Sequence, residues 1–319
     1  MKLRASIVIP ARDEAARLER VLSACRAAAR RVATETEILV ADHGSKDGTA
    51  ALARALGARV VDASAARTIA AVRNKGAAVA TGEILAFLDA DCVPSEGWLE
   101  AGIALFEEEA HAGAAGLAPA LGPGEPWLAR ASALFASPRP PATREETRWL
   151  PSANLLVRRS AFEAVGGFDE DLVTCEDYDL TVRLKARGLA LLRDPALATV
   201  HLREPASARS LFRKERWRGL SSFAGAWRHG LVGGELPSLV LPPWHAVAAV
   251  SLGLAALAGA PRLAVGALAA LALPSLALAA RAAFKARRPG AFPGLVAFAF
   301  IYSAARTAAL VPSGKVPSA

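Results

Sequence analysis

Short apolar runs alternate with longer amphipathic segments through the first ninety residues. The runs at residues 6–10, 37–41, 59–62 and 84–88 predict buried strands. The segments at 15–31, 49–56 and 68–80 have the helical apolar spacing seen at Leu18, Val21, Leu22 and Cys25. Strands that alternate with helices predict βαβ units, a parallel sheet and a nucleotide-binding half of Rossmann type. No Gly-x-Gly-x-x-Gly follows these strands, which disfavours a nicotinamide or flavin cofactor.

The next hundred residues continue the mixed pattern. Helices are expected at 98–109, 161–165 and 176–188, and a strand at 152–157. A last strand region is expected to begin at 191–192 and to continue at 198–201. Residues 119–144 are rich in Pro, Gly, Ala and Ser and are predicted to be loop-dominated. Acceptor specificity is expected in that segment and around Trp149.

The last third of the chain changes character. Residues 207–231 are basic, aromatic and amphipathic, which fits either an interfacial helix or an ordinary surface helix. Apolar stretches follow at 239–258, 263–280 and 292–310, each close to the roughly 20 residues that a transmembrane helix needs. Two or three membrane helices are therefore expected, either as full crossings or as a hairpin within the membrane.

The charge distribution supports a membrane segment. The chain has 38 Lys and Arg against 30 Asp and Glu, yet no acid occurs after Glu235. Seven basic residues lie in that acid-free part, which leaves 38 − 7 = 31 basic against 30 acidic residues before it. A nucleic-acid partner is therefore not expected, because such a partner requires a basic face on the globular part. A soluble core would need acidic surface residues, and this part of the sequence has none.

Topology is predicted from the basic residues. Arg281, Lys285, Arg287 and Arg288 separate the second and third apolar stretches, and the positive-inside rule places them in the cytoplasm. The first residues do not resemble a signal peptide, and the three cysteines have no pairing or metal-binding spacing. We expect a protein of the cell membrane with its first domain on the cytoplasmic face.

The sequence Asp89-Ala90-Asp91 directly follows the predicted strand 84–88. Residues two apart on a strand share a face, and ligands of open α/β sheets bind outside the carboxyl ends of the strands. Two carboxylates there would suit a divalent cation that carries phosphate oxygens. A surface acid pair in a turn is the alternative for this motif taken alone.

Six motifs in one order resemble glycosyltransferase family 2, which has the GT-A fold, an α/β fold whose Rossmann-like mixed sheet is flanked by helices. The resemblance covers roughly the first two hundred residues. It implies a GT-A domain at 1–205, an amphipathic interface-helix region at 206–235 and a membrane domain at 236–319. The motifs are Ser6-Ile-Val-Ile-Pro-Ala-Arg-Asp-Glu, Val40-Ala-Asp-His-Gly-Ser-Lys-Asp-Gly-Thr, Arg73-Asn-Lys-Gly, Asp89-Ala-Asp, Gly166-Gly-Phe-Asp-Glu and Glu176-Asp-Tyr-Asp-Leu.

The resemblance implies a donor site and a metal site. Asp91 and His201 would hold Mn²⁺ or Mg²⁺, although His201 is also consistent with a half-buried histidine bonded to the backbone. Helix capping is the alternative role for Asp13 and Glu14, and a solvated helix face for the two cations Arg73 and Lys75. The donor residues that the family pattern gives are Pro10, Ala11, Asp13, Glu14, Asp42, Arg73, Lys75, Asp89 and Ala90.

The resemblance also implies a general base. Asp177 is expected to take the proton of the acceptor hydroxyl, with Glu176 and Asp179 orienting it. Helix capping is the alternative for these acids, but three acids in four positions exceed what a cap needs. Arg213, Arg216 and Trp217 resemble the Gln-x-x-Arg-Trp motif of processive members, with Arg213 where Gln is expected. That departure argues against processive polymerisation and suggests contacts with a diphosphate or the bilayer surface.

The predicted function is a metal-dependent inverting glycosyltransferase. It would move a sugar from a nucleotide-sugar donor, expected to be a UDP-sugar with a GDP-sugar as the alternative, to a lipid-linked or other membrane-proximal acceptor. A nucleotidyltransferase of related topology is one alternative, but its Gly-rich basic loop is replaced here by the acidic Pro10-Ala-Arg-Asp-Glu. An inactive, membrane-anchored nucleotide-binding protein is the other.

Overall fold

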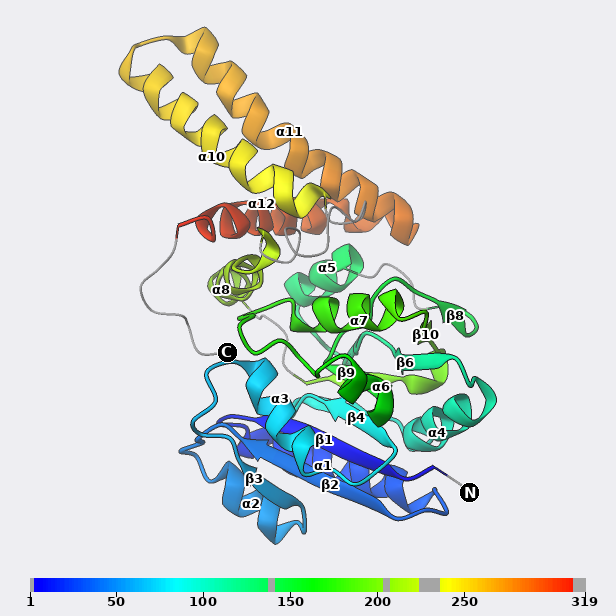
Figure 1. Cartoon of the computed structure of the whole chain (residues 1–319). Helices are drawn as coiled ribbons and strands as arrows, with labels where there is room; N and C mark the ends of the chain where they lie inside the picture. The colour runs from blue at the N-terminus through cyan, green and yellow to red at the C-terminus, as the bar shows by residue number, and fades with distance from the viewer. Residues whose placement is uncertain (1–2, 137–140, 203–206, 224–235, 312–319) are drawn as a thin grey trace. The chain divides into compact units, whose positions relative to one another are not determined.

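The computed structural model describes residues 3–136, 141–202, 207–223 and 236–311 (Figure 1). The chain divides into two compact units. The first comprises Met1–Gly122 and Pro140–Arg203, and the second comprises Pro123–Arg139 and Glu204–Ala319. We describe each unit by itself.

The first unit is built on an eight-stranded mixed sheet of order β3-β2-β1-β4-β9-β6-β10-β8. The neighbours β3, β2, β1 and β4 are parallel, whereas β9 is antiparallel to both β4 and β6. The predicted α/β class with a mixed sheet is confirmed. The strands are β1 (Ala5–Ala11), β2 (Thr36–Asp42), β3 (Arg59–Asp62), β4 (Ile84–Leu88), β6 (Ala112–Gly116), β8 (Glu145–Glu146), β9 (Asn154–Arg158) and β10 (Ala190–Arg193).

Helices cover both faces of this sheet, so its central strands are apolar on both sides. In β1, Ile7 and Ile9 belong to one buried cluster and Val8 to the other, as alternation along a strand requires. The first cluster includes residues of α1 (Ala15–Arg30), α2 (Thr49–Ala55) and α4 (Trp98–Glu108). The second includes residues of α3 (Ile69–Ala78), α6 (Arg159–Ala164) and α7 (Glu176–Ala186). A layer of helices therefore packs against each face of the sheet.

A second, three-stranded sheet of order β5-β11-β7 contains one of two segments that were expected to form a single strand region. Its strands are β5 (Cys92–Pro94), β11 (Thr199–His201) and β7 (Ala120–Leu121). The expected continuity of 191–192 with 198–201 is wrong, because β10 belongs to the large sheet and β11 to this one. The 3₁₀-helix η1 (Pro195–Leu197) intervenes, and the Asp194 side chain accepts from the N–H of Ala196 at its start.

Strand β6 has the sequence Ala-Gly-Ala-Ala-Gly and was not predicted. Alanine and glycine have low strand propensity, yet all five residues are buried between β9 and β10. Close packing explains the small side chains. A Cβ atom at Gly116 would lie 2.4 Å from the backbone oxygen of Asn154 on β9.

We expect Gly116→Ala to lower the free energy of unfolding of the first unit by about 3 kcal/mol, the upper end of the range for overpacking. The neighbouring atom is backbone, so it cannot rotate away as a side chain would. Urea unfolding followed by the fluorescence of the fully buried Trp98 measures the effect. Gly97→Ala is the matched control, because nothing lies within 4 Å of a Cβ there. Equal stability of the two variants would contradict the prediction.

The second unit is helical and has its own buried cluster. Its helices are α5 (Trp127–Ala136), α8 (Ala208–Gly219), α10 (Leu236–Leu257), α11 (Pro261–Ala286), the 3₁₀-helix η2 (Pro289–Ala291) and α12 (Phe292–Ala308). The cluster joins residues from α5, α8, α11 and α12, among them Leu128, Leu211, Ala282 and Phe298. Helices α10 and α11 run side by side as a hairpin (Figure 1).

The prediction that 119–144 is loop-dominated is corrected by α5 and β7, because each forms through distant contacts. Helix α5 buries Leu128 and Ala131, one helical turn apart, against the cluster of the second unit. The Pro and Gly residues before α5 belong to the turn that precedes it. Their presence made the short apolar face of α5 difficult to recognise in the sequence.

Among the described residues, three helices are long and apolar enough to cross a membrane: Pro237–Leu257, Pro261–Ala286 and Pro289–Ala308. In an apolar surrounding, a backbone group freed by proline needs another partner. Pro274 in α11 cannot donate to the carbonyl of Ala270, which instead accepts from the Trp244 indole at 2.9 Å. His245 Nε2 lies 3.2 Å from the carbonyl oxygen of Leu271. Pro274 is thus compatible with a membrane surrounding.

A buried ion pair ties α12 to α8 within the second unit. Glu215 is 2% exposed, and its two carboxylate oxygens lie 3.0 Å from Arg306 Nη2 and 3.0 Å from Arg218 Nη1. These two arginines offset the burial of Glu215 and hold its pKa below the usual value. Arg306 also lies over the ring of Tyr302. Helix α8 therefore supplies the carboxylate that pairs with Arg306, because the apolar helices contain no acid.

Candidate active site

Hydrogen bonds from backbone N–H groups tie the loops after β1 and β2 together and order the second loop. The N–H of Lys46 donates to Asp13 Oδ1 at 2.7 Å, and the N–H of Asp13 donates to Ser45 Oγ at 3.0 Å. The N–H of Ser45 faces both oxygens of Asp42 at 3.3 Å. Asp13 has a φ of 53°, in the left-handed region that few residues adopt. The two loops thus form one rigid polar rim at the carboxyl edge of the sheet.

Asp13 and Glu14 do not cap α1 with their side chains. Glu14 occupies the N-cap position without a side-chain cap bond, and its carboxylate pairs with Arg17 at 2.6 Å. Its backbone N–H donates to Thr49 Oγ1 at 2.9 Å. Pro10 and Ala11 end the buried strand β1 beside this rim. The structure therefore brings together the residues expected for the donor's base and ribose.

Arg73 joins two carboxylates that are far apart in sequence. Its guanidinium, on α3, lies 2.8 Å from Asp89 Oδ1 after β4 and 2.7 Å from Glu176 Oε1 at the start of α7. The Arg73 and Glu176 side chains are 4% and 7% exposed, whereas that of Asp89 is 31% exposed. Burial disfavours the charge on Arg73, but the two carboxylates outweigh it and raise its pKa. Arg73 is thus a buried bridge rather than part of a solvated helix face.

Asp177 is the more accessible of the two acids at the start of α7. Ser152, just before β9, holds both acids: its N–H donates to Asp177 Oδ2 at 3.2 Å and its hydroxyl to Glu176 Oε1 at 3.3 Å. The N–H of Tyr178 donates to Asp177 Oδ1 at 2.8 Å. Asp177 is half-buried, which leaves its carboxylate reachable, whereas Glu176 is buried. The arrangement suits Asp177 as a proton acceptor and Glu176 as a buried support.

Asp91 and His201 meet where β5 pairs with β11. His201 Nε2 lies 3.5 Å from Asp91 Oδ1, and the ligand atoms of Asp91, Cys92 and His201 lie within 4.8 Å of one another. Carboxylate oxygen and imidazole nitrogen are suitable ligands for Mn²⁺. The Cys92 thiol is buried and 3.8 Å from Asp91 Oδ1, and a hard cation disfavours it as a ligand. The residues present therefore fit a divalent metal held by Asp91 and His201.

The remaining predicted residues have other positions. Ala90 is buried between the two acids of its motif. Lys75 is exposed on α3 near the carboxylate of Asp62, on a different side of the helix from Arg73. The Asp179 carboxylate pairs with Arg183, which donates to the backbone oxygens of Val165 and Gly167. Asp179 thus supports the Gly166-Gly167 turn.

The basic-aromatic motif belongs to α8 in the second unit. Arg213 is exposed and Trp217 is half-buried. Arg216 donates to the backbone oxygens of Ala308 and Val311 at 3.3 Å, at the end of α12. A cation that binds the last carbonyls of a helix stabilises it. Residues 224–231 of the predicted amphipathic segment lie outside the described residues.

No motif in the sequence indicates the roles of Ser152 and Cys92. Ser152 contacts both acids from a turn that carries no motif, and Cys92 comes together with His201 only through the β5–β11 pairing. Neither position has a local signal in the sequence, because each depends on a strand pairing between distant segments.

The proton affinity of Glu176 gives a pH prediction. Burial, followed by the neighbouring Asp177 carboxylate, raises the pKa of Glu176 from 4.5 to about 7, against the opposing charge of Arg73. The folded protein therefore binds more protons than the unfolded chain between pH 4.5 and 7, and its stability should fall as pH rises through that window. We expect Glu176→Gln to remove this slope. Thermal unfolding of both proteins at several pH values measures it, and parallel profiles would refute the expectation.

The comparisons with known proteins identify the family. The model of the family described as Glycosyl transferase family 2 matches residues 6–166, just over half of the chain. A pre-mycofactocin glycosyltransferase from Mycobacterium tuberculosis is 31% identical over 205 residues, which are 61% of this chain and 42% of that protein. An N-acetylglucosaminyl-diphospho-decaprenol L-rhamnosyltransferase from the same organism is 36% identical over 116 residues, which are 33% of this chain and 36% of that protein. The chain therefore spans less than half the length of these two relatives.

The fold is shared with a solved enzyme. A mannosyltransferase from Pyrobaculum calidifontis, in complex with GDP-Man and Mn²⁺, aligns with a TM-score of 0.63 and 21% identity, over 97% of this chain and 86% of that one. This likeness concerns the fold alone. The family match shows that this chain belongs to glycosyltransferase family 2, and the likeness to the solved enzyme shows that it has the GT-A fold.

Proposed function

We propose that this enzyme is a metal-dependent, inverting glycosyltransferase that uses a nucleotide-sugar donor and a lipid-linked or other membrane-proximal acceptor. The observation that supports it most is the group of acids that Arg73 joins between the end of β4 and the start of α7. Asp89 is joined through Arg73 to Glu176, and Glu176 is followed by the accessible Asp177. Asp91 lies two residues after Asp89, and His201 lies opposite Cys92 in the β5–β11 pair. The proposed metal ligands and the proposed base are thus connected through Asp89 and Arg73.

The rim formed by the loops after β1 and β2 is the proposed site of the donor's base and ribose. Asp13 and Asp42 offer carboxylates held by backbone N–H groups, beside Pro10, Ala11 and Glu14. Asp89 is partly exposed, so it can accept from a ribose hydroxyl while it pairs with Arg73. The donor is a UDP- or GDP-sugar. The solved mannosyltransferase of this fold holds GDP-Man, which is consistent with the second.

The proposed metal site consists of Asp91 and His201. When Mn²⁺ or Mg²⁺ is bound, it acts as a Lewis acid and offsets the negative charge that builds on the departing diphosphate. Asp91 supplies a carboxylate oxygen, and His201 supplies Nε2, the ring nitrogen that faces it. The Cys92 thiol beside them is fully buried and supports the position of Asp91.

Asp177 is the proposed general base. The acceptor hydroxyl oxygen forms a bond to the anomeric carbon of the donor sugar while its proton passes to the Asp177 carboxylate. The bond from that carbon to the diphosphate oxygen breaks, and the diphosphate leaves with the electron pair. Attack opposite the leaving group inverts the anomeric centre. The N–H groups of Ser152 and Tyr178 hold the carboxylate in one orientation, which such a transfer requires.

The second unit supports a lipid acceptor at the cell membrane. In the part of the chain that the structure describes, three helices are long and apolar enough to span a bilayer, and one relative is named for a decaprenol-linked acceptor. Arg281 and Lys285 lie in the last turns of α11, and Arg287 and Arg288 directly follow it, which favours a cytoplasmic face for the connection to α12. The catalytic unit is proposed to lie on the same face.

A donor panel tests the proposal. The full chain in detergent is incubated with UDP- and GDP-sugars, with Mn²⁺ or with a chelator, and donor hydrolysis and transfer to polyprenyl phosphate are measured. We expect turnover of one donor only with metal, and a loss of at least about a hundredfold in Asp91→Asn, since metal stabilisation of the leaving group is worth several kcal/mol. Asp171→Asn, an exposed acid, is the control. Metal-independent turnover, or equal loss in both variants, would overturn the proposal.

A further inference from the structure

The second unit contains a cavity between α5 and the beginning of α12. Its volume is about 740 Å³. Trp127, Arg130 and Leu134 line it from α5, and Arg288, Pro293 and Ala297 line it from the end of the α11–α12 connection and from α12. None of these residues belongs to the proposed transfer chemistry. The cavity therefore needs its own explanation.

One wall of the cavity is apolar. A Cβ atom at Gly294 would lie 3.5 Å from the Trp127 ring, so the indole lies directly against α12 where that helix has no side chain. Trp127 is nevertheless 52% exposed. Leu134 and Ala297 are half-buried beside it. This wall is suited to a hydrocarbon chain rather than to a sugar or a nucleotide.

Two arginines add positive charge to the lining of the cavity. Arg130 and Arg288 are exposed, and among the described residues neither guanidinium forms an ion pair. The sequence explains this, because no acid follows Glu235 and Glu125 is the one acid in residues 123–136. In addition, no side chain caps the N-terminus of α12, whose dipole favours an anion. The cavity thus combines an apolar wall with uncompensated positive charge.

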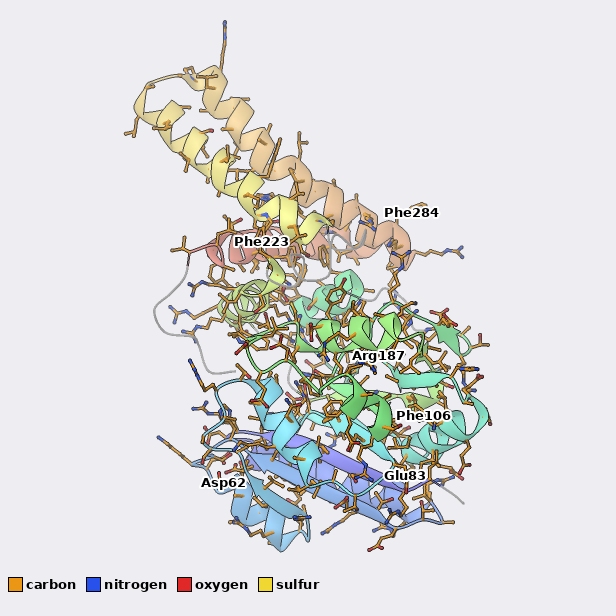
Figure 2. The ribbon with its side chains drawn as sticks, viewed as in Figure 1. Asp62, Glu83, Phe106, Arg187, Phe223 and Phe284 are labelled. Carbon is orange, nitrogen blue, oxygen red and sulfur yellow. The ribbon has the colours of Figure 1, made fainter. Side chains whose placement is uncertain are left out.

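The surroundings indicate where the anion comes from. Phe284, near the end of α11, is 83% exposed (Figure 2), and Phe292 at the start of α12 is 38% exposed. Lys285 lies in the last turn of α11, and Arg287 is the residue that ends it. Exposed aromatic rings among basic residues are typical of segments at the membrane–water interface. A bilayer lipid reaches such a cavity directly, with its headgroup at the level of the arginines.

We propose that this cavity binds an anionic membrane phospholipid. The guanidinium groups of Arg130 and Arg288 hold the lipid phosphate through charge-assisted hydrogen bonds, and an acyl chain lies along Trp127, Leu134 and Ala297. The residues that line the cavity all belong to the second unit, and none of them has a role in the proposed transfer chemistry. It makes the anionic lipid a partner of the second unit.

Lipid binding is measured by native mass spectrometry of the full chain in detergent, titrated with dioleoyl phosphatidic acid or dioleoyl phosphatidylcholine. Each basic residue near a lipid phosphate contributes about fivefold in affinity, so we expect Arg130→Gln with Arg288→Gln to weaken phosphatidic acid binding about thirtyfold. The matched control combines Arg262→Gln with Arg281→Gln, which removes the same charge from exposed positions outside the cavity. The control should change binding less than threefold.

A second measurement uses a variant in which the charge of the protein is unchanged. Brominated phosphatidic acid should quench tryptophan fluorescence in the wild-type chain more than brominated phosphatidylcholine does, and Trp127→Phe should remove the difference. Equal losses in the two double variants would overturn the proposal, because attraction would then be general. Displacement of the lipid by inorganic phosphate at equal concentration would also overturn it, since the cavity would be a free-anion site. Equal binding of the two lipids would do so too.

Discussion

Asp177→Asn is expected to lower sugar transfer by about 10²–10⁴-fold, the usual contribution of a positioned general base. Asparagine keeps the shape of the side chain and can still accept from the N–H of Tyr178, so the start of α7 should not move. It cannot take the proton of an acceptor hydroxyl. The loss should therefore appear in kcat, with donor affinity unchanged.

The measurement is steady-state transfer with the donor that the panel identifies, together with a thermal-shift titration of that donor and Mn²⁺. Asp171→Asn again serves as the control, because it removes an exposed carboxylate from the turn before α7. If Asp177→Asn retains more than a tenth of the wild-type kcat, Asp177 is not the base. If it loses donor binding instead, the residue belongs to the donor site.

Sequence patterns were most informative where one local segment carries both structure and chemistry. Strand β4 is a fully buried apolar run, and Asp89 and Asp91 follow it directly, so strand and acids could be predicted together. The same holds for β1 and β2, whose ends carry Asp13 and Asp42. In these segments local propensity and the global fold agree, which makes short motifs informative.

Features that depend on distant contacts were not predictable. Arg73 and Glu176 are 103 positions apart, and nothing in the sequence of α3 indicates that its arginine is buried. Strand β6 is built from alanine and glycine, and only the close approach of β9 explains that choice. Helix α5 has a short apolar face, and its role is evident only from its packing against α12. In each case tertiary packing overrides local propensity.

The pairing of Glu215 with Arg306 shows the same limit in the second unit. The acid-free tail was evident from composition, and it suggested apolar helices with basic ends. The structure adds that α12 receives a carboxylate from α8, so one of its basic residues is neutralised inside the unit. A single arginine near the end of an apolar stretch therefore did not reveal its buried partner.

Arg73→Met is expected to lower the free energy of unfolding of the first unit by about 3–5 kcal/mol, the cost of removing one partner from a buried ion pair. Methionine has a similar length and no charge, so the variant leaves Glu176 buried without a cation and Asp89 without its 2.8 Å partner. Lys75→Met is the matched control. It removes an exposed lysine from the same helix and should change stability by less than about 0.5 kcal/mol.

The double variant Arg73→Met with Glu176→Gln separates charge from packing. Glutamine removes the uncompensated carboxylate, so part of the lost stability should return if the electrostatic account is right. Urea unfolding followed by the fluorescence of Trp98 gives all four values of the cycle. No recovery in the double variant would mean that Arg73 acts through its packing on the Phe168 ring, 5.7 Å away. Transfer that is lower in the double variant than in Glu176→Gln alone would show that Arg73 also positions Asp89 for the donor.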